Sequence, residues 1–232
     1  MAMLAWNVRG LGNKDTVSAL KNVAFKHKAN IIFLGETKQK KRYIEKIRMK
    51  MKFDNVFYVE PDGIAGRLAL WWSNNVKLSI LHYDKNFIDT KISINGETDW
   101  FGTFIYAPPY TEVGPEEKHG GNPFDHNSAK WYYEFLDQTY LMEIPSSGGS
   151  FTWSNQRCNE ELILEKLDRI LSSLEWSFIF PKAISIIDVA IASDHSPIIL
   201  LVNGVAKKSK KDFKFESRWL IVKECSQVVN DE

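Results

Sequence analysis

Long apolar runs are missing from this sequence of 232 residues. No stretch approaches the roughly 18 consecutive apolar residues that a membrane-spanning helix needs. The first residues, 1–6, lead directly into a short apolar segment and lack the cationic start and longer apolar stretch of a signal peptide. We therefore expect a protein that makes no membrane contact, is not secreted, and is nuclear or cytoplasmic.

Cysteine and net charge are also low. Cys158 and Cys225 are the only cysteines, too few for a disulfide framework or a cysteine-ligated metal cluster, so we expect two reduced thiols. Lys and Arg total 30 against 29 Asp and Glu, a formal net charge of +1. No overall basic field predicts a nucleic-acid partner, so any site for a polyanion has to be local. Lysine-rich runs at 38–42 and 207–211 are more often solvated faces than binding sites.

The composition favours one large domain. Hydrophobic residues make up 44% of the chain, enough to fill a sizeable core. Beyond residue 203 the sequence turns to lysine, serine and other charged residues. We expect a folded domain over residues 1–203, a charged tail or linker over 204–232, and a monomer.

The first half of the chain alternates strand and helix and then turns to strands alone. Residues 3–8 and 31–34 are short apolar runs, and between them Leu20, Val23, Ala24 and His27 recur at helical spacing. Aromatic and β-branched runs follow, with Asn95-Gly96 as the most specific hairpin signal; they lie at 56–59, 68–72, 76–82, 87–94 and 100–106. This order predicts an α/β sandwich with mixed sheets.

The second half has a weaker pattern. Residues 107–123, rich in proline and glycine, predict a loop, and 146–150 a flexible link. The remaining segments predict helices at 129–140 and, for the most part, 160–172, with strands at 151–153, 183–189 and 198–202.

Six polar residues lie at or near the ends of the apolar runs: Asn7, Glu36, Tyr106, Asp168, Asp194 and His195. Each has a structural explanation of its own, such as a turn cap for an asparagine or a helix-surface ion pair with Arg169 for Asp168. Together they suit phosphodiester hydrolysis. Oxygen ligands hold magnesium, which bridges to phosphate oxygens, and an aspartate fixes the tautomer of a histidine that contacts phosphate.

Six blocks in order carry a family resemblance: LAWNVRGLGN (4–13), IIFLGETK (31–38), GTFIYAPP (102–109), FTWSN (151–155), LDRIL (167–171) and SDHSPI (193–198). The chain resembles the endonuclease/exonuclease/phosphatase superfamily, and within it the apurinic-like endonuclease domain of plant non-LTR (LINE-type) retrotransposons, which accompanies a reverse transcriptase. The segments GIAGRLALWW (63–72) and FKFESRWL (213–220) are similar to the same elements. The resemblance implies a DNase I-like sandwich with helices on its outer faces.

The resemblance also implies a role for each residue. Asn7 orders the metal site, and Glu36 is the principal ligand of Mg²⁺, with Mn²⁺ as the possible substitute. Tyr106 orients the scissile phosphate. Asp168 holds the imidazole of His195, which stabilises or protonates the phosphate, and Asp194 lies beside the metal and the attacking water. Thr152 and Asn155 are implied to line the groove that binds the DNA strand.

One signature of the family is missing. A buried strand that ends in Gly-Asp-Phe-Asn is expected between Tyr106 and Phe151, and its aspartate activates the water. Either an internal strand has been deleted or the sequence is a mis-joined gene model. Asp125-His126-Asn127 has the right spacing but follows glycines instead of an apolar strand, and it is more typical of an exposed turn.

Three functions follow from this reading. The first is a divergent, magnesium-dependent DNA endonuclease domain of retrotransposon origin that nicks its substrate. The second is a non-catalytic remnant that binds nucleic acid or has no activity. The third is a small-molecule phosphatase, because the superfamily also contains such enzymes.

Overall fold

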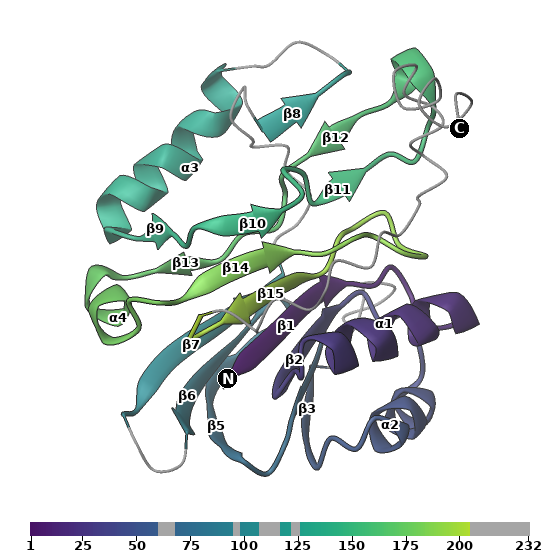
Figure 1. Cartoon of the computed structure of the whole chain (residues 1–232), viewed down its shortest axis with the longest axis vertical. Coiled ribbons are helices and arrows are strands. Elements are labelled where there is room, and N and C mark those ends of the chain that lie inside the picture. Colours follow the sequence, from purple (N-terminus) through teal and green to yellow (C-terminus); the bar gives the residue numbers. More distant parts are fainter. Residues whose placement is uncertain (60–67, 95–97, 107–116, 122–125, 205–232) are drawn as a thin grey trace, which may run out of the picture.

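The computed structural model describes residues 1–59, 68–94, 98–106, 117–121 and 126–204. Its largest element is a seven-stranded mixed sheet in the order β10-β14-β15-β1-β2-β4-β3 (Figure 1). β1 and β2 are parallel neighbours, and β1 pairs with β15 in the antiparallel sense. The strands are β1 (Ala2–Asn7), β2 (Ile31–Gly35), β3 (Asn55–Val59), β4 (Leu68–Trp72), β10 (Ser146–Gly148), β14 (Ile184–Ile187) and β15 (Ile198–Leu201).

Both faces of this sheet are buried, which explains the continuous apolar runs of the sequence. Successive side chains of β1 point to opposite faces, so that Leu4 belongs to one core cluster and Met3 to the other. The same alternation separates Leu34 from Phe33 in β2 and places Trp71 of β4 with Leu34. The central strands therefore hold two cores together, and their ends are fixed in position.

Two helices cover one face of the large sheet. They are α1 (Lys14–Lys26), which Asn13 caps by accepting a hydrogen bond from the backbone of Asp15, and α2 (Lys41–Lys50), which buries Ile44 and Ile47. The sequence predicted α1 but not α2, in which Ile44 and Ile47 are the only buried residues of a mostly charged segment. The lysine run at 38–42 thus leads into a helix.

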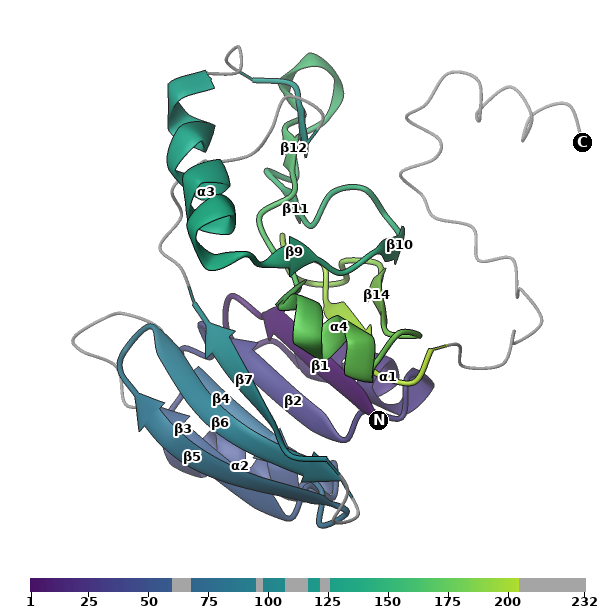
Figure 2. The ribbon, with the colours of Figure 1, turned by 90° about the vertical axis from the view of Figure 1, so that its left-hand side faces the viewer.

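A second sheet packs against the other face, as Figure 2 shows. Its three antiparallel strands, β5 (Val76–Tyr83), β6 (Phe87–Ile94) and β7 (Trp100–Ile105), confirm the predicted meander. Ile88, Ile92 and Phe104 point into the inter-sheet core. Within the described residues β7 is an edge strand, paired with β6 alone. The predicted two-sheet α/β sandwich is therefore confirmed; Asn95-Gly96 lies outside the described residues.

Most of the rest of the described chain, apart from α4, forms small elements above the sandwich (Figure 2). Two-residue strands make a three-stranded sheet in the order β11-β12-β8 and a pair β13-β9. The bounds are β8 (Lys118–His119), α3 (His126–Thr139), β9 (Met142–Glu143), β11 (Trp153–Ser154), β12 (Leu164–Glu165), β13 (Leu171–Ser172) and α4 (Leu174–Ile179), with a 3₁₀ turn at Asn159–Glu161. The predicted helix at 129–140 is confirmed as α3.

A largely buried arginine joins these small elements. Arg169 donates two hydrogen bonds of 2.6 Å to the carboxylate of Glu117 and one of 3.2 Å to Glu143. Its guanidinium also lies over the ring of Tyr132 in α3. Bidentate arginine–carboxylate contacts are geometrically demanding, so this group fixes the segment that contains Asp168.

Two predicted segments were wrong. Residues 160–172 form a 3₁₀ turn and two short strands instead of a helix, because β12 and β13 use this backbone to pair with β8, β9 and β11. Residues 146–150, predicted to be a flexible link, contain the edge strand β10. Gly148 has a φ of 97°, and a Cβ there would lie 2.2 Å from the carbonyl oxygen of Ile187. Glycine thus permits this close parallel pairing.

Several expectations concern residues outside the described ranges. These are the tail predicted at 204–232, apart from Gly204, together with Cys225 and most of the loop predicted at 107–123. Cys158 is exposed and forms no disulfide. No helix within the described residues has the length and apolar character that crossing a bilayer requires.

Candidate functional site

Asn7 and Glu36 meet at the carboxyl ends of two neighbouring parallel strands. Asn7 ends β1 opposite Gly35, the last residue of β2. The Asn7 Nδ2 donates a hydrogen bond of 2.9 Å to Glu36 Oε1, and Lys38 Nζ lies 2.6 Å from Glu36 Oε2. Burial raises the pKa of Glu36, but hydrogen bonds from Lys38, Asn7 and Tyr106 outweigh it and lower the pKa below its usual value. Glu36 is therefore an anion at neutral pH.

Tyr106 reaches the same carboxylate from the second sheet. Its hydroxyl donates to Glu36 Oε1 over 3.0 Å, and its backbone N–H donates to the carbonyl of Asn86 in the turn between β5 and β6. A Cβ on Gly35 would lie 3.2 Å from the Tyr106 ring, so a glycine at that position lets the ring lie against β2. Burial and the charge of Glu36 raise the pKa of Tyr106 to about 12, which keeps the hydroxyl protonated.

Asp168 and His195 form a second polar pair. The Nδ1 of His195 lies 2.9 Å from Asp168 Oδ2, and both side chains are largely buried. Burial alone would lower the pKa of His195. The hydrogen bond to Asp168 and the negative charges of Asp168, Asp194 and Glu36 outweigh that effect and raise the pKa. The imidazolium is thus favoured, with its Nδ1 held by Asp168.

Thr152 positions Asp168. Its side chain is fully buried, and its Oγ1 accepts hydrogen bonds from the backbone N–H groups of Leu167 and Asp168 at 2.9 and 2.8 Å. Its carbonyl accepts from the backbone of Ser196, one residue after His195. The family resemblance implied that Thr152 lines the groove that binds the DNA strand. The structure instead makes it an internal support that links the Asp168 segment to the His195 segment.

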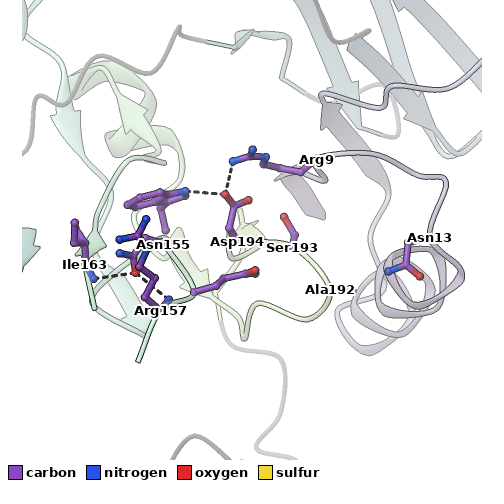
Figure 3. A pocket seen from close by; sticks show the side chains of 10 residues that line it. Arg9, Asn13, Asn155, Arg157, Ile163, Ala192, Ser193 and Asp194 are labelled. Carbon is purple, nitrogen blue, oxygen red and sulfur yellow. Dashed lines mark hydrogen bonds and ion pairs between the residues drawn. The ribbon is translucent and has the colours of Figure 1, made fainter. Parts of the chain in front are cut away.

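Asp194 is held by two donors. Its Oδ2 accepts from Arg9 Nη1 at 2.5 Å and from the indole nitrogen of Trp153 at 3.0 Å (Figure 3). Its Oδ1 is buried and has no hydrogen-bond partner within the described residues. A buried carboxylate oxygen without a partner is costly, and a cation or an ordered water at this atom would satisfy it.

The two polar groups belong to one site. Ser193 Oγ donates a hydrogen bond of 2.9 Å to the carbonyl of Asn7 and accepts one from the backbone N–H of His195. The indole nitrogen of Trp6 donates to the carbonyl of His195 at 2.8 Å. The end of β1 therefore fixes the His195 segment directly. This agrees with the contribution of Glu36 to the raised pKa of His195.

Strained backbone is concentrated here. Among the described residues, nine that are not glycine have positive φ; five of these belong to the site or to the cavity beside it, namely Arg9, Glu36, Lys38, Gln156 and Ala192. Each such residue costs of order 1–3 kcal/mol, and such conformations persist where the surrounding structure enforces them, often at functional sites.

Few protein side chains at this site offer oxygens to a divalent cation. The described residues contain no group of three or more His, Cys, Asp or Glu side chains arranged to hold a metal. Magnesium, however, is usually bound by one or two carboxylates and otherwise by water and substrate phosphate. Glu36, supported by Asn7, and the unpartnered Oδ1 of Asp194 offer oxygens of that kind. Lys38 and Arg9 neutralise these carboxylates in the protein alone.

Two further predicted positions, Asn155 and the described part of the segment 125–127, lie outside the two polar groups. The amide of Asn155 lines the cavity beside Asp194 but is committed to its own loop: its Oδ1 accepts from Ile163 and Arg157, and its Nδ2 donates to the carbonyl of Glu161. Asp125 lies outside the described residues, while the backbone of His126 and Asn127 begins α3.

The fold has well-defined counterparts among solved structures. The endonuclease domain of TRAS1, a telomere-specific non-LTR retrotransposon, matches 86% of this chain over 96% of its own length, with a TM-score of 0.60 and 14% identity. The AP endonuclease LMAP from Leishmania major matches with a TM-score of 0.64 and 15% identity over 86% of each chain. The 3′-5′ exonuclease NExo from Neisseria meningitidis matches 87% of this chain over 99% of its own, with a TM-score of 0.61 and 15% identity.

The chain has the endonuclease/exonuclease/phosphatase superfamily fold. At these identities the likeness establishes the fold alone. No protein-family model matches the sequence, and no curated protein does. The superfamily fold agrees with the order of the six sequence blocks that predicted it.

Sequence reasoning missed four residues that build the site: Arg9, Lys38, Trp153 and Ser193. Each adjoins a predicted residue or lies within a quoted block, so proximity to a motif was the available signal. Their partners could not be read from the sequence, because Arg9 and Asp194, for example, are 185 positions apart.

Proposed function

We propose that this chain is a metal-dependent DNA endonuclease domain of retrotransposon descent, which nicks its substrate by phosphodiester hydrolysis. One observation carries the proposal: the Asp168–His195 pair and the Asn7–Glu36–Tyr106 group lie at the same end of the large sheet and are connected through Asn7 and Ser193. The likeness of the fold to a retrotransposon endonuclease domain supports the substrate class.

The charge states of these residues suit a phosphate ester. A protonated His195, oriented by Asp168, donates a hydrogen bond to the phosphate or a proton to the leaving oxygen. Tyr106 keeps its hydroxyl proton, which it donates to Glu36 in the protein alone and would turn toward a phosphate oxygen when substrate binds. Glu36 and Asp194 would hold the Mg²⁺ or Mn²⁺ ion, whose chemistry when bound is to polarise the phosphate and stabilise the negative charge of the transition state.

Water activation is the weak step of the proposed reaction. The Gly-Asp-Phe-Asn segment that the resemblance leads us to expect is missing from the sequence. General-base assistance is typically worth about 10²–10⁴ in rate. We therefore expect slow nicking, limited by the attack of water.

A second candidate is a domain that binds DNA without cleaving it. Lys38 and Arg9 occupy the two carboxylates that a metal would need. If a cation displaces neither basic side chain from its carboxylate, the site retains its shape and its affinity for phosphate. It then lacks the ion that supports hydrolysis.

Nicking of supercoiled plasmid separates the two candidates. The protein is incubated with Mg²⁺, Mn²⁺ or EDTA beside Glu36→Ala and His195→Ala variants. Matched controls are Glu134→Ala and His82→Ala, which alter exposed residues on α3 and β5. We expect cation-dependent nicking by the unaltered chain and both controls, and loss of at least 100-fold in the two site variants.

The opposite results are equally informative. Nicking that survives both site substitutions contradicts the assigned site, and no nicking by the unaltered chain favours the binding domain. Hydrolysis of p-nitrophenyl phosphate, a phosphate ester without a nucleobase, in place of plasmid would instead support a small-molecule phosphatase.

A further inference from the structure

The strand β7 has an open edge. Among the described residues it pairs with β6 alone. The N–H of Tyr106 donates to the carbonyl of Asn86, a pair that continues the β6–β7 register. Bonded and non-bonded pairs alternate along antiparallel strands. The backbone N–H and C=O groups of Phe101, Thr103 and Ile105 therefore point away from β6, and we call them the edge-facing groups of β7.

Nothing in the sequence of β7 protects this edge. The strand contains no charged residue and no proline, and its register with β6 is uninterrupted. Edge strands are usually blunted by lysine, proline or a bulge, because their open backbone groups are a template for pairing. Phe101 and Ile105 also project from the outer face of the sheet, 70% and 60% exposed, while Trp100 and Phe104 are buried in the inter-sheet core. The edge thus offers a further strand both backbone partners and an apolar surface.

The described domain ends close to this edge. Gly204 is its last residue, and a Cβ there would lie 2.7 Å from the carbonyl oxygen of Lys182. Two residues before Lys182, the ring of Phe180 packs on the ring of Trp100, with the centroids 6.1 Å apart. Trp100 is the first residue of β7. The residues that follow Gly204 therefore start near one end of the open edge.

The sequence beyond Gly204 contains one run that suits a strand. Residues 219–222 are Trp-Leu-Ile-Val, the longest uncharged apolar run in 205–232. Aromatic and β-branched residues of this kind favour strands. Fourteen residues separate Gly204 from Trp219, and an extended chain advances about 3.3 Å per residue, so this linker can span about 50 Å. A strand of the length of β7 measures only about 20 Å. The run can therefore reach every position along the edge.

We propose that residues 219–222 add to the open edge of β7 as a fourth strand of the second sheet. Strand addition supplies main-chain hydrogen bonds to the edge-facing groups, and alternate side chains of the added strand cover Phe101 and Ile105. A tethered segment competes at an effective concentration of the order of mM, which favours it over a second copy of the chain. Because Tyr106 directly follows β7, the added strand also supports the residue whose hydroxyl binds Glu36.

Amide hydrogen exchange, followed by NMR on the full chain, tests this directly. We expect slow exchange of the edge-facing amides of β7 in the unaltered chain. Leu220→Pro and Ile221→Pro are tested separately: successive N–H groups of a strand point to opposite sides, so one of the two removes a bond to β7. That variant should speed exchange of the edge-facing amides by about tenfold or more. Val228→Pro, in the same part of the sequence but outside the run, is the matched control and should leave them unchanged.

A substitution on β7 tests the other side of the contact. Phe101→Lys places a charge on the edge strand, a device that discourages strand addition, and should speed exchange of the Thr103 and Ile105 amides. Phe25→Lys alters a phenylalanine of α1 that is 86% exposed and is the matched control. The amide of Leu34, in the central strand β2, reports global stability and should exchange equally slowly in every variant.

The outcomes separate the possible occupants of the edge. Slow exchange that does not depend on protein concentration and is lost in a proline variant of 219–222 supports the added strand. Protection that grows with protein concentration and survives both substitutions assigns the edge to a second copy and overturns the inference. Fast exchange of the edge-facing amides in the unaltered chain also overturns it. None of these results depends on whether the chain cleaves DNA.

Discussion

Replacing Asp168 with asparagine removes the charge that supports the imidazolium of His195. The two side chains are 2.9 Å apart, and their exposed fractions are 12% for His195 and 25% for Asp168. A hydrogen bond to a charged group typically contributes about 1.5–3 kcal/mol. Because Asp168 is partly exposed to solvent, we take the lower end, about 1.5 kcal/mol.

The sign of the pH dependence follows from the raised pKa. A histidine whose pKa is higher in the folded state than in the unfolded state stabilises the fold. This contribution is fully present at pH values below the unfolded-state pKa, about 6.5. That contribution is lost as the pH rises through the folded pKa. The Asp168→Asn variant should therefore lose about 1.5 kcal/mol of unfolding free energy at about pH 6 and distinctly less at about pH 9.

Two measurements check this prediction. NMR titration of the imidazole resonances should show a lower His195 pKa in Asp168→Asn than in the unaltered chain, and urea unfolding at the two pH values should show the stability difference. Asp137→Asn, an exposed substitution on α3, is the matched control and should change neither. An unaltered His195 pKa, or a larger stability loss at the higher pH, would refute the reasoning.

Two other substitutions test a support of the site, Thr152, and an ion pair that joins the end of α1 to Asp188. Thr152→Val leaves two backbone N–H groups of the Asp168 segment without an acceptor, so urea unfolding should show a loss of about 2–4 kcal/mol, whereas Thr152→Ser should lose much less. Burial raises the pKa of Asp188, but hydrogen bonds from His27, Lys26 and its neighbouring backbone lower it overall. Asp188→Asn should therefore destabilise the chain at neutral pH by about 1–3 kcal/mol, a cost that shrinks as the pH falls through the acidic range; a constant cost would contradict this.

Much of the sandwich was predictable from sequence because its strands are buried on both faces or alternate cleanly. β1, β2 and β4 are short apolar runs bounded by polar residues. A sheet covered on both sides buries β2 and β4 completely and most of β1. The region above the sandwich was less predictable. Its two-residue strands carry no periodicity, and the spacing of apolar residues in 160–172 resembled a helix although tertiary pairing decides its structure.

The candidate site shows the same division. Asn7, Glu36 and His195 were found because polar residues at the ends of apolar strands have no packing role there. Thr152 was assigned to the groove by resemblance, yet its hydroxyl is used inside the protein. The counter-ions Arg9 and Lys38 were missed. Both residues have left-handed backbone conformations, which the sequence does not predict, and their ion pairs with Asp194 and Glu36 depend on them.

The central claim is that Glu36 and His195 converge on one cation-binding pocket. Paramagnetic broadening by Mn²⁺ tests it most directly, since the effect falls steeply with distance from the ion. Titration with substoichiometric Mn²⁺ should broaden the His195 ring resonances while those of His82 and His119, on β5 and β8, remain sharp. Glu36→Gln should abolish the broadening. Equal broadening of all three histidines, or a His195 signal that Mn²⁺ leaves sharp, would contradict the account.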